Sequence, residues 1–197
     1  HGVALAYEMS ARLGVGPRRE QRIRRLRSLV ADLVVHPSRS AFRRTRWNFD
    51  RAHGVDTEGA VGEAELGIDP ANPDGRYKYE ASSLKHVRYA FGHIPAPLER
   101  WSFVDMGSGK GRIVLIALGH PFRRVAGVEY AAGLHEIAAR NLDRYRGPRR
   151  AGGVELVHGD ALRTPLPGGD TVVFFYNSFA GAMLGGYLEH LEREGRA

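Results

Sequence analysis

The spacing of hydrophobic positions changes at about residue 99. Before it, residues 17–35 carry apolar side chains at intervals of three and four, which predicts an amphipathic helix, and residues 81–94 predict a second one. Residues 36–76 are rich in Gly, Pro, Asp and Asn, which is typical of loops with short elements. We therefore expect residues 1–98 to form a helical N-terminal extension.

After residue 99, short apolar runs alternate with amphipathic ones. The runs predict strands at 102–106, 124–130, 153–160 and 170–179, and helices at 111–119, 131–146 and 180–194. This alternation is typical of a parallel sheet with helices on both faces. Residues 99–197 are therefore expected to form a Rossmann-like, doubly wound α/β core.

The first predicted strand runs directly into a glycine-rich turn, "VDMGSGKGR". Glycines at 107, 109 and 111 allow positive φ angles and let a ligand approach bare backbone. Their spacing does not match the dinucleotide pattern, because the third glycine comes one residue early, and it does not match a phosphate loop. Asp105, before the loop, would repel a pyrophosphate and suits a positively charged ligand. A nicotinamide oxidoreductase is therefore disfavoured.

Polar residues follow the other predicted strands in chain order. Glu129 ends the second strand, where an acid can accept hydrogen bonds from both ribose hydroxyls. Asp160 ends the third strand, where it either accepts from an adenine amine or caps a loop, and both interpretations stay open. The fourth strand ends in Tyr176, Asn177 and Phe179. A glycine loop and two acids at successive strand ends favour a nucleoside-containing ligand.

The set "VDMGSGKGR", "GVEY", "GDA" and "FFYNSF" resembles the class I S-adenosylmethionine-dependent methyltransferases. The resemblance covers about residues 77–190 and implies a Rossmann-like fold, S-adenosylmethionine as cofactor and methyl transfer to an acceptor. In this family the glycine loop lies under the methionine and ribose parts of the cofactor, and the second acid binds the ribose. The cofactor-binding residues that we carry over or add beside the motifs are Asp105, Met106, Gly107, Ser108, Gly109, Gly111, Glu129, Tyr130, Asp160, Ala161 and Tyr176.

A narrower resemblance concerns the methyl acceptor. The chain is similar to the non-SET histone lysine methyltransferases, and to bacterial proteins of unassigned substrate with stretches like "FDRAHGVDT" and "YEASS". An amine is thus a candidate acceptor, with Asn177 holding its nitrogen and Tyr77, Tyr79 and Phe179 beside the substrate. Enzymes that methylate amino groups often carry prolines after the Asn, and their absence here counts against an adenine-N6 activity.

The family's sheet continues beyond the fourth strand with a fifth strand, a helix and a β-hairpin. This sequence ends after the helix that follows the fourth strand. We expect either that the last strands are absent, or that the sheet is short and its edge is covered by the N-terminal part or by another subunit.

Composition adds charge and excludes cysteine chemistry. The chain of 197 residues has no cysteine, a net charge of +7 and 29 basic residues, of which only Lys78, Lys85 and Lys110 are lysines. Arginines surround the apolar stripe of residues 17–35, and we interpret them as a solvated helix face rather than a nucleic-acid surface. No metal site and no membrane-spanning segment are expected, and the composition fits a cytoplasmic protein. The alternative to an enzyme is a non-catalytic module that binds a nucleotide-like ligand or a protein partner.

Overall fold

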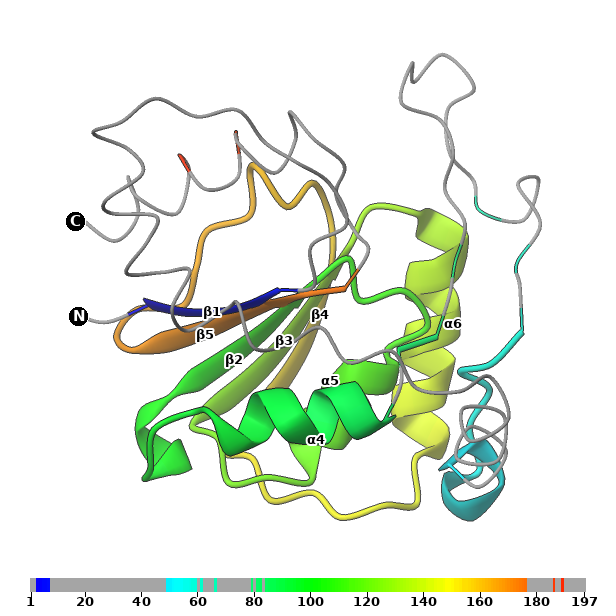
Figure 1. Cartoon of the computed structure of the whole chain (residues 1–197). Helices are drawn as coiled ribbons and strands as arrows, with labels where there is room; N and C mark the ends of the chain where they lie inside the picture. The colour runs from blue at the N-terminus through cyan, green and yellow to red at the C-terminus, as the bar shows by residue number, and fades with distance from the viewer. Residues whose placement is uncertain are drawn as a thin grey trace.

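The computed structural model describes residues 3–7, 49–59, 61, 66, 79, 81–82, 84–176, 186 and 189. Figure 1 shows a sheet with helices packed against it. The elements in chain order are β1 (Val3–Tyr7), α4 (Leu84–Gly92), the short 3-10 helix η2 (Leu98–Arg100), β2 (Ser102–Met106), α5 (Arg112–Leu118), β3 (Arg124–Glu129), α6 (Ala132–Arg144), β4 (Val154–His158) and β5 (Thr171–Phe175).

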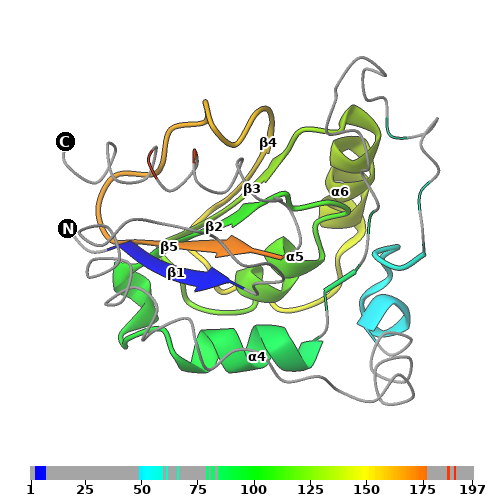
Figure 2. The same ribbon diagram turned by 45° about the horizontal axis from the view of Figure 1, so that its top comes forward.

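The five strands form one parallel sheet in the order β1-β5-β2-β3-β4. From β2 the chain moves through α5 to β3 and through α6 to β4, and then returns to place β5 on the other side of β2. The helices α5 and α6, which connect β2 to β3 and β3 to β4, lie on one face of the sheet, and α4 lies on that face as well (Figure 2). The predicted Rossmann-like, doubly wound fold is confirmed, with the strand order reversing between β2 and β5.

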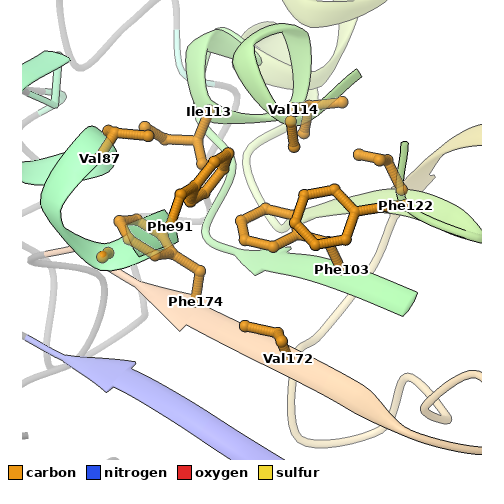
Figure 3. Close-up of a cluster of buried hydrophobic side chains, with 11 residues drawn as sticks. Val87, Phe91, Phe103, Ile113, Val114, Phe122, Val172 and Phe174 are labelled. Atoms are coloured by element: carbon orange, nitrogen blue, oxygen red, sulfur yellow. The ribbon is translucent and has the colours of Figure 1, made fainter. Parts of the chain in front are cut away.

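The main hydrophobic core lies between the sheet and the helices α4 and α5. Figure 3 shows Phe103 and Phe174 of the sheet pointing toward Phe91 of α4, with Val114 of α5 above them. The ring centroids of Phe91 and Phe103 are 5.1 Å apart in an edge-on arrangement. A second cluster covers the opposite face, where side chains of β2, β3 and β5 pack against Ala161 and Leu166 of the β4–β5 connection. These two cores fix the ends of β2 and β3, which carry the glycine loop and Glu129.

Strand β1 was not predicted from the sequence. It pairs in parallel with β5 along its whole length, with Val3 beside Thr171 and Tyr7 beside Phe175. Among the arrangements expected for this edge, the structure therefore has the N-terminal part beside β5. The division at residue 98 stays a prediction, although the chain before it supplies this strand.

The other predicted elements agree with the structure where it describes them. All four strands of the core and the helices α5 and α6 begin and end within four residues of their predicted bounds, and the second predicted helix is α4. The predicted helix at 17–35 lies outside the described residues. The predicted helix at 180–194 lies almost wholly outside them too, with only residues 186 and 189 described, both helical.

Candidate functional site

The carboxyl ends of β2 and β5 meet where the strand order reverses. Met106 of β2 lies beside Phe175 of β5 and beside Val128 of β3. In open α/β sheets, ligands bind at this edge, outside the carboxyl ends of the strands. The glycine loop leaves β2 here, so the predicted site residues of β2 and β3 are brought to one place.

The glycine loop is a tight turn that only glycines can form. Gly107, Gly109 and Gly111 have φ angles of 80°, 53° and 83°, in the left-handed region. The backbone N–H groups of Gly107 and Ser108 donate to the carbonyl of Val128 in β3, at 2.8 and 3.0 Å. The loop is thereby fixed to the end of the neighbouring strand and leads directly into α5.

A fourth glycine, Gly127 in β3, allows the loop to lie close to the sheet. A Cβ at this position would lie 2.6 Å from Cγ2 of Val114 and 3.0 Å from the Ser108 side chain. The Ser108 hydroxyl is buried there, and no hydrogen-bond partner reaches it within the described residues. The role of Gly127 was not predicted from the sequence, although a glycine inside an apolar strand is itself a signal of close approach.

Asp105 is a buried carboxyl group immediately before the loop. Asp105 is 3% exposed. Burial raises the pKa of the Asp105 carboxyl well above its ordinary value, and the nearby Glu129 carboxylate raises it further. No hydrogen bond within the described part of the chain offsets this effect. The site thus contains an acid whose ionisation a positively charged ligand would favour.

Glu129, at the end of β3, holds the loop from the other side. Its Oε2 accepts a hydrogen bond from the N–H of Gly109 at 2.7 Å, and its Oε1 accepts one from Ala131 at 2.8 Å. Burial raises the pKa of the Glu129 carboxyl, while the backbone donors Ala131, Gly109 and Tyr130, and then His158, lower it. Each carboxylate oxygen has a second lone pair, so these bonds leave acceptor capacity for ligand hydroxyls.

Asp160, after β4, caps a turn. Its Oδ1 accepts from the N–H of Leu162 at 2.9 Å, and its carbonyl accepts from the Thr164 hydroxyl at 2.8 Å. The capping role that the sequence left open is therefore present. Arg163 lies 3.7 Å from Oδ2 on the exposed side. Binding of an adenine amine stays a prediction.

Three further predicted residues contribute mainly to packing. Met106 is 1% exposed and Ala161 8% exposed, and both belong to the second hydrophobic core. Tyr176 packs against the first core. Only the backbone of Met106 is thus left to face the loop side. Tyr130 differs, since it is 47% exposed at the end of β3, and its carbonyl oxygen lies 3.0 Å from Nε2 of His158.

Tyr79 reaches the glycine loop from the N-terminal part. A Cβ on Gly109 would lie 2.4 Å from Cε2 of Tyr79, so the ring packs directly on this glycine. The Tyr79 hydroxyl donates to the carbonyl of Thr57 at 2.6 Å. Tyr79 therefore contacts the glycine loop, and its place beside the substrate stays a prediction.

The remaining predicted site residues, Tyr77, Asn177 and Phe179, lie outside the described residues. Among the residues that are described, no group of three or more potential metal ligands occurs. In the same part of the chain, no helix is long and apolar enough to cross a membrane.

Three polar side chains behind the loop were also not predicted from the sequence. Lys110, Arg112 and Asn141 are buried, with exposures of 4%, 2% and 3%. They contact residues 49–59, the segment that begins with the "FDRAHGVDT" stretch. A lysine and an arginine beside glycines look like solvent-exposed loop residues, and Asn141 gives no signal in the helical pattern of α6.

Several solved structures with similar folds are methyltransferases. Geranyl diphosphate C-methyltransferase from Streptomyces coelicolor A3(2), solved with Mg²⁺, geranyl diphosphate and S-adenosyl-L-homocysteine, aligns with a TM-score of 0.50 and 22% identity over 81% of this chain and 62% of that chain. Phosphoethanolamine N-methyltransferase 1 from Haemonchus contortus aligns with a TM-score of 0.42 and 19% identity, over 54% of this chain and 22% of that one. A methyltransferase from Thiobacillus denitrificans, solved with S-adenosyl-L-homocysteine, aligns with a TM-score of 0.37 and 24% identity, over 47% of this chain and 37% of that one.

The chain thus spans less than two thirds of the length of these three proteins. Scans against protein-family models and against curated proteins found no match. The comparison with the Streptomyces structure shows that the two chains share a Rossmann-like fold.

Proposed function

We propose that this chain, which has the class I methyltransferase fold, binds S-adenosylmethionine at the carboxyl ends of β2 and β3 and transfers its methyl group to an acceptor, for which an amine is the leading candidate. Of the three neighbours, the Streptomyces protein is named as a C-methyltransferase and the Haemonchus protein as an N-methyltransferase. The fold therefore does not select the reacting atom of the acceptor.

One observation carries the proposal: Asp105 is buried without a hydrogen bond among the described residues, directly before a loop of three glycines with positive φ. Burial of a carboxyl group without a partner opposes folding, because the charged form loses its hydration. A ligand with a positive charge recovers part of this free energy by favouring the carboxylate. S-adenosylmethionine carries positive charge on its sulfonium and its amino group, whereas a pyrophosphate is repelled.

The other residues support the same ligand. Glu129 keeps lone pairs for two ribose hydroxyls while it fixes Gly109. We assign Asp160 to the exocyclic amine of the adenine, through the oxygen that does not cap Leu162, and Tyr130 to a nearby contact with the base. Asn177 is assigned to the acceptor nitrogen from its position after β5.

The cofactor supplies a methyl group on a positively charged sulfur, which a nucleophile displaces in line. The chain's part is to orient and to exclude water. The glycine loop would let the methionine and ribose parts of the cofactor lie against bare backbone. Glu129 holds the loop through Gly109 and would accept hydrogen bonds from the ribose hydroxyls. Asp105 places a negative charge at a site shielded from water, where it acts more strongly than in solvent.

The test is transfer of a labelled methyl group. The chain is incubated with S-adenosylmethionine carrying a labelled methyl and with separate pools of protein, RNA and small amines. We expect the wild-type chain to transfer the labelled methyl group to one of these pools, and Asp105→Asn to transfer none. Tight binding of S-adenosylhomocysteine without transfer to any pool would favour the alternative, a non-catalytic ligand-binding module.

A further inference from the structure

Residues 49–59 fold into a compact unit around one side chain. The carbonyl of Asp50 accepts from the N–H groups of Gly54 and Val55, and its carboxylate accepts from the N–H groups of Thr57 and Glu58. The Thr57 hydroxyl donates to the same carboxylate. The segment is thus held in one shape by its own hydrogen bonds, and it meets the glycine loop as a unit.

Asn141 of α6 joins this segment to the loop. Its Oδ1 accepts from the N–H of Asp56 at 2.8 Å, while its Nδ2 donates to the carbonyl of Asp56 at 2.7 Å and to the carbonyl of Lys110 at 2.9 Å. One buried amide therefore bonds the backbone N–H and the backbone carbonyl of Asp56 in the segment, and one carbonyl in the loop. Removal of the amide would leave these three backbone groups without that partner, and it would cost most at the Lys110 carbonyl, whose bond to Asn141 is buried.

The Lys110 side chain forms a second link in the same place. Its side chain is 5% exposed, and its ammonium donates to the carbonyl of Glu58 and lies 3.3 Å from Oδ1 of Asp56. It also lies 5.5 Å from the centre of the Tyr79 ring, which covers Gly109. A buried ammonium needs such partners, so the loop and the segment depend on each other.

We infer that Asn141 is a positioning residue, which holds the glycine loop against residues 49–59 so that docking of this segment and binding of a cofactor over the loop strengthen each other. The cofactor part of this inference rests on the proposed function. The Lys110 carbonyl precedes the N–H of Gly111, which donates to Ser108 at 2.8 Å, and Gly109 is fixed to Glu129. The Asn141 side chain thereby acts on the backbone of the loop, without contact with the ligand.

The test compares Asn141→Ala with a control variant of similar chemistry elsewhere. Thr171→Val removes a buried hydroxyl that bonds the carbonyl of Pro167 at 3.1 Å, at the opposite end of the sheet strands. Binding of S-adenosylhomocysteine is measured by calorimetry, together with the melting temperature. We expect Asn141→Ala to weaken binding about 5- to 20-fold and Thr171→Val to leave it unchanged, although both lower the melting temperature. An unchanged affinity in folded Asn141→Ala overturns the inference.

Hydrogen exchange gives a second readout that needs no ligand. In the ligand-free protein, Asn141→Ala should accelerate exchange in residues 49–59 and 106–112, and Thr171→Val should not. If the wild type fails to bind S-adenosylhomocysteine, the proposed function is overturned, whereas this exchange pattern alone still decides the role of Asn141. Equal exchange in both variants overturns that role.

If Asn141→Ala does not fold, Lys110→Met replaces it, because this change keeps the aliphatic stem and removes the ammonium. Lys110→Met should also weaken the binding of S-adenosylhomocysteine. In the wild type, reciprocity also requires that S-adenosylhomocysteine slow exchange in residues 49–59. Unaltered exchange in this segment at saturating ligand contradicts the coupling.

Discussion

At the scale of single residues, Asp105 is a buried carboxyl group whose ionisation opposes folding. Its pKa is raised in the folded chain, so the folded state holds its proton more tightly than the unfolded state does. The stabilising effect of this proton is fully present below the ordinary pKa of 3.8 and is lost as the pH rises through the folded-state pKa. At neutral pH the residue therefore destabilises the ligand-free chain.

We predict that Asp105→Asn raises the melting temperature at neutral pH and weakens binding of S-adenosylhomocysteine. Each kcal/mol gained in the free energy of unfolding should raise the melting temperature by about 2–4 °C. This gain should disappear at pH values below about 3.8, where both side chains are neutral. Asp143→Asn, at an exposed position of α6, serves as the control and should change neither quantity. A lower melting temperature in Asp105→Asn at neutral pH would show that the carboxylate is stabilised by groups that we have not identified.

Glu129 has two roles in this account, one toward the loop and one toward the ribose. Glu129→Ala removes charge-assisted hydrogen bonds and should cost roughly 1.5–3 kcal/mol of binding, or about ten- to a hundredfold in affinity for S-adenosylhomocysteine. Glu136→Ala, an exposed glutamate of α6 that is 3.7 Å from Arg140, is the matched control. If both variants bind like the wild type in calorimetric titrations, Glu129 is not part of the site.

At the scale of elements, the glycine loop depends on conformation and on close packing. We predict that Gly109→Val abolishes cofactor binding while the sheet stays folded. Its φ of 53° disfavours a β-branched residue, and its Cβ would collide with the Tyr79 ring. Gly153→Val is the control, because a Cβ there meets nothing within 4 Å. Circular dichroism checks the fold and calorimetry the binding, and normal binding by Gly109→Val would contradict the described loop geometry.

The elements of the core could be predicted because they are local. The strand runs and the glycines at 107, 109 and 111 have strong patterns, and the positions of Asp105 and Glu129 follow from the parallel sheet. Strand β1 could not be predicted, because its pairing with β5 joins residues far apart in sequence. Asn141 was missed for the same reason, since its partner Asp56 is 85 positions away.

At the scale of the whole molecule, the net charge of +7 raises the question of nucleic-acid binding. The arginines of residues 17–27 lie outside the described residues, and their assignment to a solvated helix face stays a prediction. We expect weak RNA binding in the wild type, with little change when Arg18, Arg19, Arg22 and Arg25 are replaced by glutamine. The contrary result would be sub-micromolar binding at physiological salt that is lost in the quadruple variant. Its log K would fall with log salt by a slope of roughly −0.7 per neutralised phosphate. That result would make a nucleic-acid acceptor the leading candidate.

The central claim, that the chain binds S-adenosylmethionine at the ends of β2 and β3, is tested most directly by calorimetric titration of the wild-type chain with S-adenosylhomocysteine. The account predicts one site per chain, with an affinity that falls in Asp105→Asn and Glu129→Ala. A folded wild-type chain that gives no binding signal up to millimolar ligand would contradict it.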